Sequence, residues 1–233
     1  MLHQQLEEEH DLFMQQSRVW VFSGAALLAL IAGYINVVML GFFQVPVSHM
    51  SGAVSQIGID AWFDDWRHLV LIGSIVGGFF LGAFISGLIV ETTTLRMSRR
   101  YGVALLLEGI ILIAATALAL SGISWAVALA SMACGLQNAM AGSYRGLTIR
   151  TTHVTGIVTD LGALIGNRLR HRKVKSWKLG LLITILSSFF IGGLLGALTF
   201  SIVGMLALGV AAIVCLLIGA AVVVYFKPHS NAR

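Results

Sequence analysis

Hydrophobic residues along this chain form six long runs, which shorter polar stretches separate. Each run holds roughly 20 residues, the length of helix that crosses the hydrocarbon core of a bilayer. The pattern predicts six transmembrane helices, at residues 19–43, 68–90, 101–121, 123–142, 177–201 and 203–226. Residues 1–18 form a polar N-terminal tail, and residues 227–233 form a C-terminal tail.

Composition strengthens this interpretation. Hydrophobic residues make up 58% of the 233 residues, charged residues make up only 11%, and the mean hydropathy is +0.90. A water-soluble domain of this size needs more charge on its surface. The lipid bilayer is therefore the first expected partner, and the acidic N-terminus argues against a cleaved signal peptide.

Basic residues gather in two of the stretches between the runs. Residues 91–100 carry three arginines and residues 143–178 carry eight lysines and arginines, whereas residues 44–67 carry Arg67 against three aspartates. Basic stretches of membrane proteins stay in the cytoplasm, so both termini are predicted to be cytoplasmic. The basic pI of 9.6 is thus an orientation signal, and no nucleic-acid partner is expected.

One polar phrase occurs twice in this apolar chain. Residues 48–58 read SHMSGAVSQIG and residues 152–162 read THVTGIVTDLG. Both fit the pattern Ser/Thr-His-x-Ser/Thr-Gly-x-Val-Ser/Thr-x-x-Gly without a gap. The repeat indicates a duplicated unit, and the phrase is its best candidate for a working part.

An odd number of predicted spans separates the two copies, so the second half runs through the membrane in the opposite direction. The predicted fold class is an all-α membrane protein with six transmembrane helices in two inverted three-helix repeats, residues 19–121 and 122–226. Each phrase is expected to form a short broken or re-entrant helix, as in secondary transporters with inverted repeats. The glycine-rich runs 76–82 and 191–196 support the duplication.

Helical spacing places the hydroxyls and glycines of each phrase on one stripe. Ser48 and Thr152 are the expected N-caps, and helix N-termini attract anions. The predicted substrate-binding residues are Ser48, His49, Ser51, Gly52, Ser55 and Gln56 in the first phrase, Thr152, His153, Thr155, Gly156, Thr159 and Asp160 in the second, and Asn36, Gln137 and Asn138 in neighbouring spans.

Four ionisable residues are candidates for proton coupling, because ionisable groups inside a membrane are costly and usually functional. They are Glu108, Asp160, His49 and His153. Glu108 fits equally well as a structural acid, since it lies only about two turns from the cytoplasmic end of its span. The phrases also fit two other interpretations, a small-residue packing seam or amphipathic interfacial helices anchored by Trp62 and Trp66.

No enzymatic activity, metal site or cofactor is expected. A nucleophile such as Ser51 near His49 has no third group to orient the base. The two histidines have no Met, Cys or third His at ligand spacing. Cys134 and Cys215 lie inside predicted spans and are expected to be buried without a disulfide.

Four motifs in order resemble the YoaK family of small bacterial inner-membrane proteins, whose function is unknown. They are Ala32-Gly33-Tyr34-Ile35-Asn36, Val47-Ser48-His49-Met50-Ser51-Gly52, Gly135-Leu136-Gln137-Asn138-Ala139 and Thr151-Thr152-His153-Val154-Thr155-Gly156. The resemblance covers the chain beyond its N-terminal tail and implies six spans in the inner membrane. Asn36 departs from it, because the family often has Asp there.

The repeat and its polarity predict a secondary transporter of a small anionic or zwitterionic solute, in which the phrases meet near the membrane midplane. The small size of the chain suggests a homodimer. The alternative is a membrane scaffold or regulator that does not transport. A channel is disfavoured, because the second, fifth and sixth runs hold few polar residues.

Overall fold

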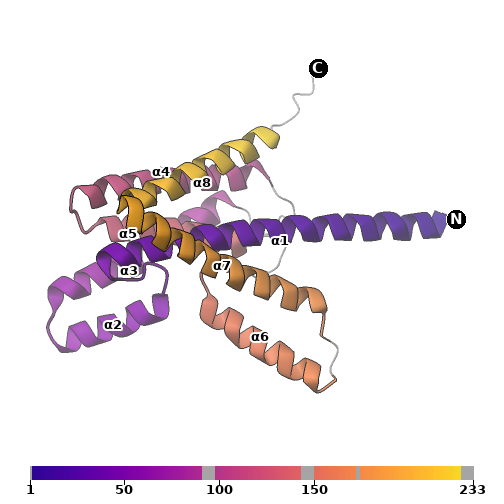
Figure 1. Ribbon diagram of the computed structural model, residues 1–233, viewed down its shortest axis with the longest axis horizontal. Helices are drawn as coiled ribbons and strands as arrows, with labels where there is room; N and C mark the ends of the chain where they lie inside the picture. The colour runs from indigo at the N-terminus through magenta and orange to yellow at the C-terminus, as the bar shows by residue number, and fades with distance from the viewer. Residues whose placement is uncertain (1, 91–97, 143–149, 172–173, 227–233) are drawn as a thin grey trace.

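The structure is a computed structural model that describes residues 2–90, 98–142, 150–171 and 174–226. Every regular element in these ranges is an α-helix (Figure 1). The eight helices are α1 (Leu2–Phe43), α2 (Met50–Trp62), α3 (Trp66–Ile89), α4 (Arg99–Leu120), α5 (Ala126–Gly142), α6 (Val154–Leu169), α7 (Ser176–Val203) and α8 (Leu206–Tyr225).

Five of these helices are long and apolar enough to cross a membrane. They are the segment Val19–Phe43 of α1 together with α3, α4, α7 and α8. The fourth expected span, 123–142, becomes the 17-residue helix α5. At 1.5 Å per residue α5 is about 25 Å long, slightly less than the hydrocarbon core. The described part of the chain is therefore all-helical, with five helices of spanning length and one shorter apolar helix, as expected for a multi-pass membrane protein.

Three close helix pairs make up the body of the molecule: α1 lies along α7, α3 along α5, and α4 along α8. Helix α5 also contacts α1 and α4, so it lies at the centre. Side chains without solvent exposure include Ile35 of α1 and Leu136 of α5. Gly122 and Gly204, both with positive φ, form the tight turns that lead into α5 and α8.

Glycines hold all three pairs at backbone contact, and in the α4–α8 pair a β carbon added to Gly102 would overlap the carbonyl oxygen of Gly219. A β carbon added to Gly192 of α7 would overlap the carbonyl oxygen of Leu30 in α1, and one added to Gly82 of α3 would overlap that of Met132 in α5. Gly33 meets Phe189, and Gly135 meets Phe79, in the same way. Lipid provides little hydrophobic drive between helices, so such close approach supplies the packing energy.

Two short helices stand beside this body, α2 against α3 and α6 against α7. The structure confirms that both phrases lead into short helices, of 13 and 16 residues. Figure 1 shows that α2 and α6 begin toward the middle of the long axis and run toward opposite ends. The turn between α2 and α3 lies at the opposite end from the C-terminal end of α6. The former contains Asp64 and Asp65, and the last turn of α6 contains Arg168.

Replacement of the packed glycines by alanine tests this architecture. Gly82→Ala and Gly192→Ala should each lower the free energy of unfolding by about 1–3 kcal/mol, because the added methyl group must displace a neighbouring backbone. Thermal or denaturant unfolding in detergent measures the change.

Gly77→Ala is the matched control, since nothing lies within 4 Å of a β carbon at Gly77 in the same helix as Gly82. Alanine is the better helix former, so this variant should be neutral or slightly stabilised. Equal losses at Gly77 and Gly82 would contradict the packing.

Candidate functional site

The two phrases begin with the same kind of hydrogen bond. The Ser48 hydroxyl donates to Asn36 Oδ1 at 2.9 Å. The Thr152 hydroxyl donates to Asn138 Oδ1 at 3.2 Å, and the Thr152 amide donates to the same oxygen at 3.4 Å. Each bond joins the segment before α2 or α6 to the helix that precedes it in the chain, α1 or α5. We call these two contacts the asparagine joints.

The prediction that Ser48 and Thr152 are N-caps is wrong. The N-cap residues are His49 and His153, and neither makes a side-chain capping bond. Each helix begins one residue later than expected, and the Ser48 and Thr152 hydroxyls donate their hydrogens to Asn36 and Asn138. A buried acceptor without a donor would cost free energy, so the joint satisfies both groups.

The Ser131 hydroxyl holds the segment before α2 from a second side. It lies 2.9 Å from the carbonyl oxygen of Val47 and 2.7 Å from that of Ile75. This buried contact connects α5, α3 and the first phrase. Sequence analysis missed it, because a single serine in an apolar helix gives no signal of its partner.

The hydroxyl stripes themselves lie on the surface of the protomer. Ser51, Ser55, Thr155 and Thr159 are exposed, as are His49, His153, Gly52 and Asp160. Ser55 donates back to the carbonyl oxygen of Ser51, and Thr159 donates back to that of Thr155. The structure thus brings together the start of each phrase and its asparagine, whereas most other predicted binding residues face outward.

The two histidines are placed differently. The His153 ring lies over Gly156 so closely that a β carbon there would overlap Nδ1. Nothing lies within 4 Å of a β carbon at Gly52, the matching glycine of the first phrase. The glycine of the second phrase therefore makes room for an imidazole, and that of the first phrase leaves open space.

Polar side chains are buried without partners in the centre of the bundle. Glu108 and Gln137 have no solvent exposure, and within the described residues neither carboxyl oxygen nor either amide atom has a hydrogen bond of normal geometry. The Cys215 thiol, a weak donor, lies beside Glu108, and Cys134 is near enough to interact electrostatically. As predicted, both cysteines are free and buried.

An ionised carboxylate at such a place, without a counter-ion or hydrogen bonds, would cost several kcal/mol. The neutral acid is therefore the form of Glu108 that this environment accommodates. Gln137 lies one helical turn from Cys134 on α5, so the two face the same side. Buried polar groups without hydrogen-bond partners can each hold a proton, a water molecule or a polar ligand group.

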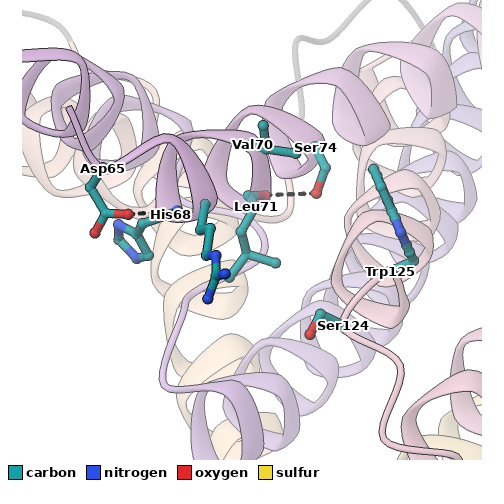
Figure 2. A pocket seen from close by; sticks show the side chains of 8 residues that line it. Asp65, His68, Val70, Leu71, Ser74, Ser124 and Trp125 are labelled. Carbon is teal, nitrogen blue, oxygen red and sulfur yellow. Dashed lines mark hydrogen bonds between the residues drawn. The ribbon is translucent and has the colours of Figure 1, made fainter.

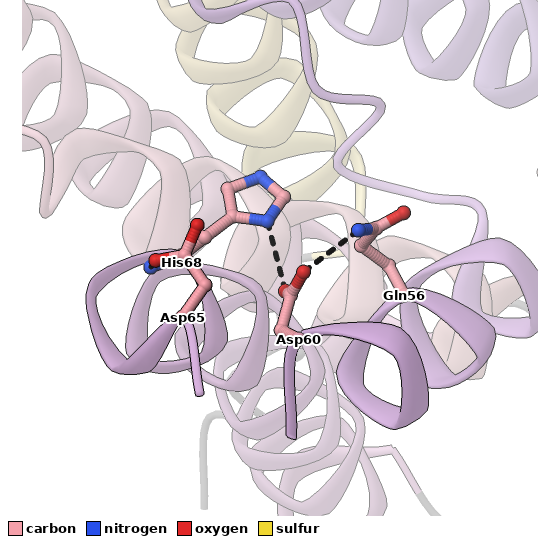
Figure 3. Close-up of polar contacts among 4 residues, drawn as sticks. All are labelled: Gln56, Asp60, Asp65 and His68. Atoms are coloured by element: carbon pink, nitrogen blue, oxygen red, sulfur yellow. Dashed lines mark hydrogen bonds and ion pairs between the residues drawn. The ribbon is translucent and has the colours of Figure 1, made fainter. Parts of the chain in front are cut away.

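A third polar cluster, which sequence analysis missed, joins α2 to α3 (Figure 3). Gln56 Nε2 donates to Asp60 Oδ1 at 2.7 Å, and His68 Nδ1 lies 2.8 Å from Asp60 Oδ2. Asp60 is only 4% exposed. The four-residue spacing of Gln56 and Asp60 on one helix could have predicted their contact. In the sequence analysis Asp60 was counted only as one of the three acidic residues of the stretch 44–67.

The partners of Asp60 determine its ionisation. Burial alone raises the pKa of this carboxyl, but the hydrogen bonds from His68 and Gln56 and the charge of His68 outweigh it, so the net pKa is below the ordinary value of 3.8. The carboxylate therefore stays ionised at neutral pH and keeps α2 docked on α3.

A cavity of about 480 Å³ opens at the same end of the molecule, with Val70 and Leu71 among its lining residues (Figure 2). Asp65, Arg67, His68 and Ser74 of the α3 side line it together with Ser124 and Trp125 from the turn before α5. It contains none of the repeated-phrase residues.

Removal of an asparagine joint should loosen the short helix that follows it. Asn36→Ala and Asn138→Ala should each lower the free energy of unfolding by about 1 kcal/mol, because a buried hydroxyl loses its acceptor. Double-mutant cycles with Ser48→Ala and Thr152→Ala measure the coupling, which we expect near 0.6 kcal/mol per pair. Additive losses in both cycles would contradict the joints.

Acid should release α2 from α3. The lowered pKa of Asp60 means that its contribution is complete above pH 3.8 and declines as the pH falls through the lower folded-state value. The protection of the backbone amides of residues 50–62, measured as their exchange rate relative to the intrinsic rate at each pH, should fall over that acid range in the wild type.

Asp60→Asn should remove this pH dependence and give faster exchange already at pH 7. Asp64→Asn is the control, because Asp64 is exposed and asparagine tolerates its positive φ. Unchanged exchange in the Asp60 variant would show that the cluster does not hold α2.

Comparison with known proteins agrees with the sequence. No curated protein and no solved structure matches the chain. The family model described as "Protein of unknown function (DUF1275)" matches residues 24–221, which include both phrases and all helices from the first span onward. The YoaK-type resemblance is thereby confirmed, since that family and this one are the same. The chain belongs to the DUF1275 family of membrane proteins of unknown function.

Proposed function

We propose that this protein is a secondary transporter of a small anionic or zwitterionic solute. The pair of asparagine joints carries the proposal. Each joint fixes the start of a short helix, and the two helices run toward opposite ends of the molecule (Figure 1). Broken helices of this kind, in two inverted halves, form the binding sites of many secondary transporters.

Matching helix contacts support the inverted repeat. If α1–α4 correspond to α5–α8, the pair α1–α7 corresponds to α5–α3, and α2–α3 corresponds to α6–α7, and all four contacts exist. The contact of Gly33 with Phe189 likewise matches that of Gly135 with Phe79. These contacts align residues 79–82 of the first half with residues 189–192 of the second half. This alignment differs by about one helical turn from the one that matches the start of the glycine run 76–82 with the start of the run 191–196.

In this proposal the protein lies in the bacterial inner membrane with both termini in the cytoplasm. The described basic residues support this orientation. The start of α4 and the end of α6 lie at one end of the bundle (Figure 1), and they carry Arg99 and Arg168. The turn between α2 and α3, which carries Asp64, lies at the other end. The first phrase then faces the outside and the second faces the cytoplasm.

The solute would contact the phrases, and a proton would bind separately. His49 and His153 stand at the N-termini of the short helices, where partial positive charge favours an anion. Glu108 is the strongest candidate for the coupled proton, because it is buried, has no partner stronger than the Cys215 thiol among the described residues, and is best accommodated as the neutral acid. Asp160 is exposed and is the next candidate. A homodimer, or a water-filled vestibule, would cover the exposed hydroxyl stripes.

One observation favours the alternative of a scaffold or regulator that does not transport. The exposed faces of α2 and α6 carry hydroxyls and glycines, among them Ser55, Gly58, Thr159 and Gly162. Nothing lies within 4 Å of a β carbon at either glycine. Small-residue faces of this kind also assemble helices of separate proteins.

Proteoliposome assays distinguish the two functions. Monocarboxylates, dicarboxylates and amino acids should first be screened for thermal stabilisation of the purified protein, since a ligand of the folded state raises its stability. The stabilising compounds should then drive proton movement in proteoliposomes. His49→Ala and His153→Ala should reduce transport at least tenfold. Wild-type rates in both variants would contradict the site assignment.

Glu108→Gln separates coupling from solute movement. The amide keeps the size of the acid but exchanges no proton, so solute exchange should continue while proton-driven accumulation disappears. Asp64→Asn, at an exposed acid outside the spans, should leave both intact. Full accumulation by the Glu108 variant would exclude this residue as the proton site.

A further inference from the structure

An apolar cavity opens among four helices at the basic end of the bundle. Its volume is about 260 Å³. Trp20 and Gly24 of α1, Tyr101 and Leu105 of α4, Met140 of α5 and Ile218 of α8 contribute to its wall. These helices contact one another in a ring, α1 with α5, α5 with α4, α4 with α8, and α8 with α1. The cavity occupies the inside of that ring.

The position of the cavity along the helices relates it to the bilayer. Trp20 lies one residue after the start of the first span, and Tyr101 lies two residues after the start of α4. Along α1 the wall continues to Leu28, about 12 Å deeper at 1.5 Å per residue. The cavity thus begins at the level of the lipid headgroups, where Trp residues concentrate, and extends into the hydrocarbon region.

The wall excludes a polar occupant. Nearly all of its side chains are apolar, so a polar solute inside would lose hydration without gaining hydrogen bonds. An alkyl chain makes no hydrogen bonds with water, so it loses none when it enters the cavity. The wall is also accessible from the side, because Trp20 is 52% exposed and Leu27 is 37% exposed. In a membrane those surfaces face lipid.

Basic residues near the opening of the cavity favour lipids with anionic headgroups over other lipids. Arg99 and Arg100 open α4 immediately before Tyr101, and both are exposed. Their positive charge attracts an anionic headgroup at the membrane surface. We propose that the cavity binds one acyl chain of an anionic phospholipid, with the lipid phosphate beside Arg99. This site is independent of the proposed transport function, since it contains none of the repeated-phrase residues.

Gly24 provides a variant that fills the cavity without strain. It lines the wall, and nothing lies within 4 Å of a β carbon built on it. Gly24→Leu therefore places a side chain in the space that the acyl chain would occupy. Gly77→Leu is the matched control, because that glycine is equally open but lies on α3, away from the cavity.

Native mass spectrometry of the detergent-purified protein measures the binding. Phosphatidylglycerol should bind the wild type and Gly77→Leu with similar affinity, and Gly24→Leu at least tenfold more weakly. Arg99→Gln should lower the preference for phosphatidylglycerol over phosphatidylcholine about fivefold, the effect of one basic residue near an anionic surface.

Competition on the wild type tests the proposal without any variant. Phosphatidylglycerol with short acyl chains should compete poorly, and glycerol phosphate, which has no chain, should not compete. Wild-type affinity in Gly24→Leu would overturn the proposal. Effective competition by glycerol phosphate would also overturn it, because binding would then depend on the headgroup alone.

Discussion

Backbone contact between helices is the constraint on which this molecule depends. Gly33, Gly82, Gly135 and Gly192 allow α1 to lie against α7 and α3 against α5 without an intervening side chain. In lipid, where apolar side chains gain little by leaving the solvent, this proximity provides the dispersion and weak Cα–H···O contacts that hold helices together. The short helices α2 and α6 then pack on α3 and α7, whose positions the glycines determine.

The helix bundle buries few polar side chains, and these differ in whether they have hydrogen-bond partners. The asparagine joints and the Asp60 cluster are paired, so they define where α2 and α6 begin and how α2 docks. Glu108 and Gln137 are buried and unpaired. A protein that maintains unsatisfied groups at its centre sacrifices stability there, and functional sites are the usual place for such a sacrifice.

The sequence predicted the parts that depend on local pattern. Hydropathy located the membrane segments, and helical spacing identified both short helices, because each signal lies within one continuous stretch. The asparagine joints could not be predicted from the sequence, because the bond from Ser48 to Asn36 depends on how the chain turns after Phe43. Asp60 was missed for a similar reason. Its partner His68 lies on the next helix, and only the α2–α3 turn brings the two together.

The short central helix has a consequence for the surface of the protein. Helix α5 is about 25 Å long, whereas the hydrocarbon core is about 30 Å thick. Helices α1, α3 and α4 surround α5, and its residues from Ala126 to Ala141 are buried or half-buried, so protein rather than lipid covers it. The turn that precedes α5 carries Ser124 and Trp125, which line the cavity beside the start of α3. The missing length of α5 is thus expected to form a water-accessible recess in the protein, while the surrounding full-length helices match the thickness of the bilayer.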